Sequence, residues 1–190
     1  MLRPRAPLKL RRLLARFERN SSGVAAVELA LVGLPFLALL FAIFELGMIY
    51  LIATSLSAAT TAEARKIRTC QLASTTTAQQ FQTALCNDDA LNWMGAMCTG
   101  NLQVTAGVYT SFQNTNNPSS SFPGNLYVAP STGPPSTYLP FSVGNPGDII
   151  LVRTYYPWTL VTPGLDGLMA QLNNGEFLIE AASTFKNEPC

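Results

Sequence analysis

Few side chains in this sequence are able to do chemistry, and the most informative is a carboxylate near the N-terminus. Glu28 stands among small and apolar residues, four positions after Val24 and five after Gly23. An ionisable group in such surroundings usually has a partner and a function, because its charge is costly away from water. The chain contains no histidine, which excludes His-based catalytic triads, imidazole proton shuttles and His metal ligands. A structural role is therefore favoured over an enzymatic one.

The residues that follow Glu28 predict the element that positions it. From Leu29 to Phe44 none of the sixteen positions is charged, and eleven hold Leu, Ile, Val or Phe. On the insertion scale these eleven side chains favour the bilayer by about 3 to 6 kcal/mol. Extended to residues 24–53, the run is long enough for the roughly 20 residues of a transmembrane helix. Glu28 is thus expected near the N-terminal end of a membrane helix.

The charges of the chain are distributed unevenly around this run. Residues 1–23 carry seven Lys or Arg and one Glu, a net charge of +6, whereas the remaining residues have a net charge of −5. Positively charged flanks stay in the cytoplasm, so the N-terminus is predicted inside and the chain beyond the helix outside. A basic head can also be a nucleic-acid arm, but the apolar run behind it favours the membrane and argues against nucleic acid.

The junction between the basic head and the apolar run has a recognisable pattern. It reads Ser22-Gly23-Val24-Ala25-Ala26-Val27-Glu28-Leu29-Ala30-Leu31-Val32-Gly33-Leu34-Pro35-Phe36-Leu37. The pattern resembles class III prepilin leaders, and most closely the TadE-like pseudopilins of tight-adherence (Flp) pilus systems, whose members look like G-A-A-A-V-E-F-A-L-V-L-P-F-L. This sequence departs from that pattern by the inserted Gly33 and by Leu29 in place of an aromatic residue. The closing Asn187-Glu188-Pro189 also resembles the family's R-N-E-P ending.

The resemblance implies that a membrane aspartyl prepilin peptidase cuts the bond between Gly23 and Val24, with this chain as substrate and not as catalyst. Glycine suits that position because, without a Cβ, its backbone can leave helical geometry inside a peptidase cleft. An ordinary secretory signal, cut near Ser57-Ala58-Ala59, is disfavoured because the apolar run exceeds the roughly 7 to 15 residues of a signal peptide.

The resemblance also implies partners and a location. The expected partners are the membrane, the prepilin peptidase, other pilins or pseudopilins, and the platform proteins of pilus assembly. The expected location is the bacterial inner membrane, crossed once, with a cytoplasmic N-terminus and a periplasmic C-terminal domain. Incorporation into the pilus itself is left open.

Three residues of the apolar helix have a predicted role. Glu28 would lie about 6 Å along the helix from the Val24 amino group freed by cleavage, and the hypothesis is that the two pair when helices assemble. The alternative is a carboxylate that reaches cytoplasmic headgroups. Pro35 removes the hydrogen-bond donor of the Leu31 carbonyl, so a bend is expected there, although membrane helices also tolerate proline. Glu45, about 32 Å from Val24, is expected to be solvated at the outer interface.

The residues beyond the span predict an α+β domain. The first helix is expected to continue to Ile67, with Leu56, Ala59, Ala62 and Ala64 facing the domain. Short helices are predicted at 78–85 and 90–97, and strands at 102–109, 148–156 and 176–185. A long helix followed by three strands favours a pilin-like fold, with an antiparallel sheet packed on the helix. The predicted organisation is a leader at 1–23, a transmembrane helix at 24–53 and an extracytoplasmic domain at 54–190, with a long exposed loop at 114–143.

Four cysteines, Cys70, Cys86, Cys98 and Cys190, all follow the span. Their gaps contain no C-x-x-C pair, so disulfides are favoured over zinc, and three pairings are possible. No Walker loop or dinucleotide fingerprint occurs, and no cofactor or metal site is predicted.

Two hypotheses from different classes remain. The preferred one is a minor pilin or pseudopilin of a type IVb, Flp-type system, processed after Gly23, that acts in pilus assembly or initiation through its N-terminal helix. The other is an uncleaved single-pass anchor that carries an extracytoplasmic binding domain. A mature chain that begins at Val24 distinguishes the first from the second.

Overall fold

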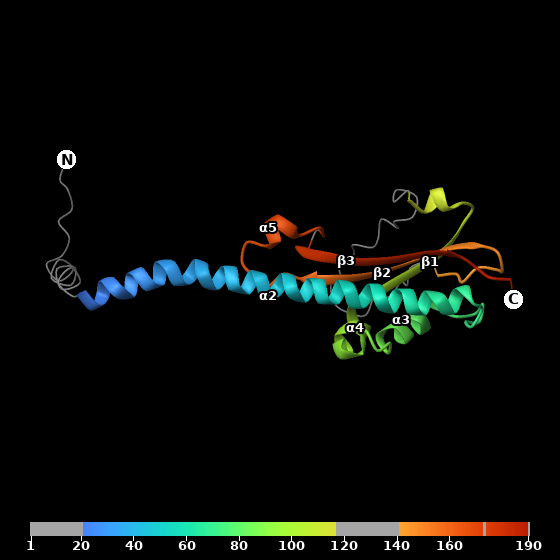
Figure 1. The fold of residues 1–190 in the computed structure, drawn as a ribbon, viewed down its shortest axis with the longest axis horizontal. Coiled ribbons are helices and arrows are strands. Elements are labelled where there is room, and N and C mark those ends of the chain that lie inside the picture. Colours follow the sequence, from blue (N-terminus) through green and yellow to red (C-terminus); the bar gives the residue numbers. More distant parts are fainter. Residues whose placement is uncertain (1–20, 117–140, 173, 190) are drawn as a thin grey trace. The chain divides into compact units, whose positions relative to one another are not determined.

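Figure 1 shows a computed structural model of the chain, which describes residues 21–116, 141–172 and 174–189. The chain divides into two compact units, Met1–Phe44 and Glu45–Cys190. Helix α2 (Ser21–Arg68) supplies the described residues of the first unit and continues into the second. The second unit begins before residue 54, the boundary expected from hydropathy, because packing inside the domain already involves Glu45.

In the first unit, α2 exposes most of its large apolar side chains. Leu31 is 77% exposed and Phe44 is 66% exposed, and most large apolar side chains between them are also exposed, although Leu40 is half-buried. Among the described helices, one stretch is long and apolar enough to cross a membrane, Gly23–Arg68, and its most apolar eighteen residues are wholly unburied within the chain. An apolar surface of this extent requires an apolar partner such as lipid or other helices.

Helix α2 ends in a hydrogen-bonded cap. Its last turn is basic, which complements the partial negative charge at a helix C-terminus. The Gln71 N–H donates to the Lys66 carbonyl at 2.9 Å and the Cys70 N–H donates to the Ile67 carbonyl at 3.0 Å, the Schellman pattern. Cys70 adopts the left-handed conformation, with φ of 58°, that glycine usually occupies at this position.

The second unit contains a three-stranded antiparallel sheet in the order β1-β2-β3. The strands are β1 (Gln103–Tyr109), β2 (Ile149–Thr159) and β3 (Glu176–Lys186). Thr105 lies opposite Arg153 of the central strand, and Arg153 lies opposite Ala182. The three strands coincide with those expected from the sequence, and the α+β class is confirmed.

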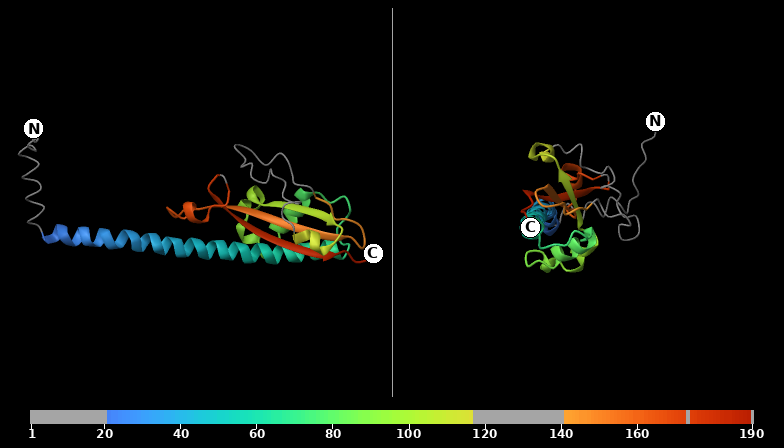
Figure 2. Two further views of the ribbon diagram at one scale, coloured as in Figure 1. Left: turned by 90° about the horizontal axis from the view of Figure 1, so that it is seen from above. Right: turned by 90° about the vertical axis from the view of Figure 1, so that its right-hand side faces the viewer.

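The second half of α2 packs on this sheet, as Figure 2 shows from two directions. Its buried residues follow helical spacing, which gives the helix one apolar face. The shared core includes Ile52, Leu56 and Ala59 of α2 with Ile150 and Val152 of β2. The hydroxyl oxygens of Thr60 and Thr154 are 2.7 Å apart in a buried hydrogen bond between helix and sheet.

One part of the predicted helix face is wrong. Ala62 is exposed, whereas Leu56, Ala59 and Ala64 are buried as expected. Glu63 is buried in place of Ala62 and pairs with Lys66 one turn further along α2. The physical reason is the helical period, because positions 56, 59, 60, 63, 64 and 67 share one face and position 62 does not.

Two short helices and a 3-10 turn lie beside the second half of α2 (Figure 1). Helix α3 (Ala78–Cys86) begins with a reciprocal capping box between Thr77 and Gln80. The predicted helix at 90–97 is instead divided into the turn η1 (Asn92–Met94) and helix α4 (Ala96–Asn101). Gly95 separates them, because its φ of 53° cannot continue a right-handed helix.

The described remainder contains two short elements that the sequence did not predict, η2 (Phe112–Asn116) and α5 (Asp166–Met169). Most of the expected loop at 114–143 lies outside the described residues. At its end, the Ser142 N–H donates to the Ala106 carbonyl at 3.0 Å, beside a parallel bridge between Ala106 and Phe141.

The C-terminal residues 187–189 return to the end of α2. The buried Asn187 amide donates to the Val143 carbonyl at 2.9 Å and to the Asn145 carbonyl at 3.1 Å. The Glu188 N–H donates to the Arg68 carbonyl at 3.0 Å, and its carboxylate pairs with the Arg68 guanidinium at 3.2 Å. The closing Asn-Glu pair therefore anchors the tail to the helix end.

Candidate functional site

The predicted processing and assembly residues lie within one stretch of α2. Gly23, Val24 and Glu28 all have helical backbone, and Val24 and Glu28 are exposed. Within the described part of the chain, Glu28 makes no hydrogen bond or ion pair. Its carboxylate is therefore available to a group outside this chain, in a segment whose other side chains are apolar.

The peptide bond between Gly23 and Val24 lies inside helical backbone. A peptidase reads a locally extended segment, so the helix has to open at this position before cleavage. Glycine makes that opening easier, since it is about 1 kcal/mol less favourable than alanine in a helix interior. The residue type therefore suits a bond that must leave the helix, and cleavage itself stays a prediction.

Pro35 lies inside α2, which continues on both sides of it. The proline is exposed, and it supplies no N–H to the Leu31 carbonyl. The helix thus tolerates one missing internal hydrogen bond in its apolar half. A bend at Pro35 stays a prediction.

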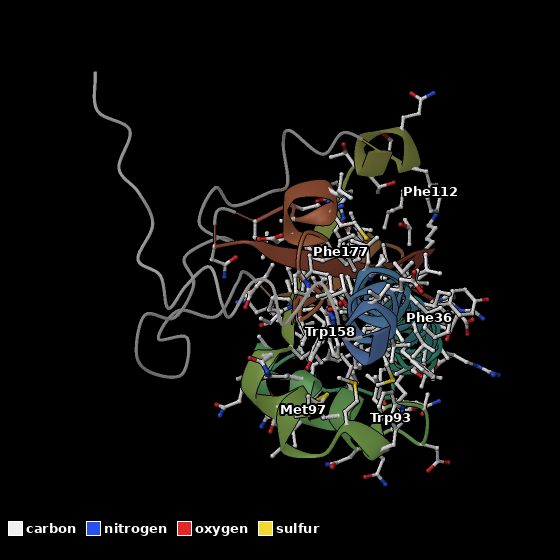
Figure 3. The ribbon with its side chains drawn as sticks, turned by 90° about the vertical axis from the view of Figure 1, so that its left-hand side faces the viewer. Phe36, Trp93, Met97, Phe112, Trp158 and Phe177 are labelled. Carbon is white, nitrogen blue, oxygen red and sulfur yellow. A yellow bond between two sulfur atoms is a disulfide. The ribbon has the colours of Figure 1, made fainter. Side chains whose placement is uncertain are left out.

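Glu45 is the functional residue that sequence reasoning misjudged. It was expected to be solvated at the outer interface, yet it is only 7% exposed. Its Oε1 accepts from the Val161 N–H at 2.6 Å and its Oε2 accepts from the Thr162 N–H at 2.8 Å. The Trp158 indole N–H also points to Oε1, at 3.4 Å, and Figure 3 labels Trp158 beside α2.

These contacts make Glu45 a clamp between α2 and the segment after β2, which we call the β2–α5 loop (Leu160–Ala170). A buried carboxylate is costly unless hydrogen bonds replace its water, and bonds to a charged acceptor are the strong ones. Glu45 also satisfies two backbone donors that lie outside any strand. The clamp therefore stabilises both partners at the first residue of the second unit.

The sequence carried only a weak signal of this clamp. Glu45 follows directly on the uncharged run that ends at Phe44, which singled out the position without its partner. Trp158, Val161 and Thr162 are 113 to 117 positions away along the chain. Only the packing of β2 on α2 brings them to the carboxylate.

The described cysteines of the second unit are oxidised. Cys86 at the end of α3 bonds to Cys98 of α4, with their Cα atoms 5.7 Å apart. Cys70 is also disulfide-bonded, and Cys190 lies outside the described residues. The expectation of disulfides is confirmed for Cys86 and Cys98, one of the pairings that the sequence left open. Over residues 21–116, 141–172 and 174–189, no group of three or more acidic, His or Cys side chains could hold a metal ion.

Taken together, an apolar N-terminal helix that leads into an α+β domain built on its own second half defines a pilin-like protein. Comparison with known proteins shows that residues 23–65 are similar to the family described as TadE-like protein. The resemblance predicted from the residues is thereby confirmed, and the match includes Gly23, Glu28 and Glu45. No curated protein and no solved structure matches the chain.

The match is to a family associated with the tight-adherence pilus, and every matched residue lies in α2. Residues 66–190, which include the sheet, lie outside the matched region.

Proposed function

We propose that this chain is a minor pilin or pseudopilin of a tight-adherence pilus system, processed after Gly23 by a prepilin peptidase. It acts in pilus assembly or initiation through the N-terminal helix that cleavage leaves behind. The observation that carries the proposal is the TadE-like match, which begins at Gly23 and covers the apolar, exposed part of α2.

The proposed topology follows from charge and hydropathy. The basic residues 1–23 keep the N-terminus in the cytoplasm, and the second unit lies in the periplasm. The Cys86–Cys98 disulfide suits that compartment, where disulfides persist. Because Glu45 is buried in the domain, we place the membrane span at residues 24–44, which corresponds to about 31 Å of helix against a hydrocarbon core of about 30 Å.

The proposed assembly step uses the new N-terminus. Cleavage leaves an ammonium group on Val24, and Glu28 is the nearest acidic side chain after it in the sequence. Their pairing, within one chain or between neighbours, would remove the cost of an isolated carboxylate in an apolar environment. The proposed partners are the peptidase, other pilins or pseudopilins, and platform proteins that hold them.

The test is the N-terminus of the mature protein in cells that hold the peptidase. The intact mass and N-terminal sequence of the purified chain should show that it begins at Val24. Gly23→Val should retain the leader, because the side chain obstructs the peptidase cleft. Gly33→Val is the matched control, since a Cβ at Gly33 meets no atom within 4 Å, and this variant should be cleaved normally.

The opposite result would favour the uncleaved anchor. If the wild-type chain keeps Met1 in such cells, the processing proposal is wrong. If Gly23→Val and Gly33→Val are cleaved equally, the glycine is not the determinant of the site.

A further inference from the structure

The β2–α5 loop carries the two most exposed large hydrophobic side chains of the described chain. Leu168 is 84% exposed and Val161 is 79% exposed, more than any large hydrophobic residue of the apolar half of α2. From Leu160 to Leu172 the only charged residue is Asp166. Single exposed apolar side chains are ordinary on a soluble surface, so the attachment of this loop to Glu45 carries the argument.

Hydrogen bonds hold this loop in one arrangement. Glu45 accepts from the N–H groups of Val161 and Thr162 at the start of the loop. Further along, the Leu165 N–H donates to the Thr162 carbonyl at 3.2 Å, and the Leu168 N–H donates to the Leu165 carbonyl at 3.1 Å. The exposed side chains are thus presented by a tethered structure.

The residue that directly follows the loop, Gln171, is hydrogen-bonded to β3. The Gln171 N–H donates to the Glu176 carbonyl at 3.0 Å, and the Gln171 side chain accepts from the Leu178 N–H at 3.3 Å. Because hydrogen bonds fix the chain on both sides of Leu168, this exposed side chain belongs to an attached segment.

The position of Glu45 along α2 identifies what covers the loop. The proposed span ends at Phe44, so Glu45 is the first residue past the hydrocarbon core. The backbone of Val161 and Thr162 lies within hydrogen-bond distance of that residue, at the level where lipid headgroups begin. Tyr50, five positions further along α2, is 72% exposed, and Trp158 donates to Glu45, in keeping with the enrichment of both residue types at membrane surfaces.

We propose that the β2–α5 loop is a second membrane contact, in which Val161 and Leu168 enter the outer leaflet of the inner membrane beside the α2 span. The Glu45 clamp sets the loop at the bilayer surface. This inference rests on the proposed membrane span of residues 24–44.

The test uses nitroxide labels on the full-length chain in vesicles of phosphatidylethanolamine and phosphatidylglycerol. The labelled variants are Val161→Cys and Leu168→Cys, with Ser74→Cys as the water-exposed control and Leu37→Cys as the control for the span. No described cysteine is free, so among the described residues labelling is confined to the new thiol. All four positions are exposed in the structure, so each variant should fold.

The readout is the relative collision rate of each label with oxygen, which concentrates in lipid, and with a water-soluble nickel chelate. Labels at Val161 and Leu168 should show an oxygen-to-nickel ratio several-fold above that at Ser74 and below that at Leu37. One result would overturn the inference and leave the proposed function intact. In that result the Leu37 label lies in lipid, and the labels at Val161 and Leu168 are as accessible to the nickel chelate as the label at Ser74.

Two other results also overturn the inference. Protection of Val161 and Leu168 from both reagents would place the loop against protein. If the Leu37 label is accessible to the nickel chelate, residues 24–44 do not span the membrane. That result would also contradict the membrane part of the proposed function.

Discussion

At the scale of single residues, two carboxylates on one helix have opposite environments. Glu28 is exposed among apolar side chains and has no partner within the described chain, whereas Glu45 is buried and accepts three N–H groups. The difference is geometric. Trp158, Val161 and Thr162 lie within hydrogen-bond distance of Glu45, and no described residue hydrogen-bonds to Glu28. Within the described chain, the Glu28 carboxylate is therefore left without a hydrogen bond, and the Glu45 carboxylate is bonded to its own chain.

Removal of the Glu45 carboxylate should destabilise the second unit. Glu45→Ala leaves the backbone donors of Val161 and Thr162 without their acceptor, at a cost of about 1 to 3 kcal/mol. Chemical unfolding in detergent, followed by tryptophan fluorescence, measures the loss of unfolding free energy. Asp89→Asn removes one exposed acidic charge as a control and should change stability by less than about 0.5 kcal/mol. Equal unfolding midpoints for Glu45→Ala and the wild type would contradict the clamp.

Replacement of Glu28 should act on assembly and leave the fold unchanged. Glu28→Ala removes the proposed partner of the Val24 ammonium, and we expect the amount of surface pilus to fall, with partial recovery in Glu28→Asp. Leu31→Ala, one turn further along the same exposed helix, is the control and should assemble pili. Sheared pilus fractions and the mature N-terminus are measured together. Normal cleavage and normal pilus amounts in Glu28→Ala would refute the pairing.

At the scale of elements, the region from α3 to α4 is held by side chains more than by regular structure. Gly95 interrupts its helices, and the Cys86–Cys98 disulfide crosses the interruption. The buried Gln82 amide donates to the Thr99 carbonyl at 3.0 Å and to the Leu102 carbonyl at 2.6 Å, which binds α3 to the start of β1. Short helices of this kind are not stable alone, so these links maintain them.

Loss of the Cys86–Cys98 disulfide should therefore cost stability. The two cysteines are 12 positions apart, and closing a loop of this size stabilises a fold by about 3 kcal/mol in the chain-entropy treatment. The double variant Cys86→Ala with Cys98→Ala should lower the unfolding free energy by about that amount. Met97→Ser, an exposed change in the same region, is the control and should have little effect. Unfolding curves that coincide with the wild type would show that the bond is dispensable.

At the scale of the whole molecule, the C-terminal tail fastens the end of the chain to the end of α2. Asn187 joins the tail to the segment before β2, and Glu188 bonds to Arg68 through both backbone and side chain. The Cys70 Sγ lies 3.6 Å from the Glu188 carbonyl oxygen. The helix that begins in the first unit is thereby bound to the last residues of the second.

A covalent link should reinforce this attachment. Cys86 and Cys98 bond to each other and Cys70 is disulfide-bonded, so among four cysteines Cys190 is the partner we predict for Cys70. A protease digest without reducing agent should yield one linked peptide pair with Cys70 and Cys190 and another with Cys86 and Cys98. Any peptide that joins Cys70 to Cys86 or Cys98 would contradict the prediction.

The sequence by itself determined the local features of this protein. Three features depend only on consecutive residues, and each was predicted within a few positions. They are the apolar run, the β-branched strands and the Gly-Val-Ala-Ala-Val-Glu motif. Their physical basis is local, because hydropathy, strand propensity and family pattern all depend on near neighbours in the chain.

The tertiary structure decided what depends on contacts between distant residues. It placed Glu45 against Trp158, Val161 and Thr162, exposed Ala62 and buried Glu63, and selected Cys98 as the partner of Cys86. It also divided the helix expected at 90–97, where the backbone turns at Gly95. The Glu45 contacts have little signal in neighbouring residues, because they depend on which face of α2 the sheet covers and on where β2 ends along it.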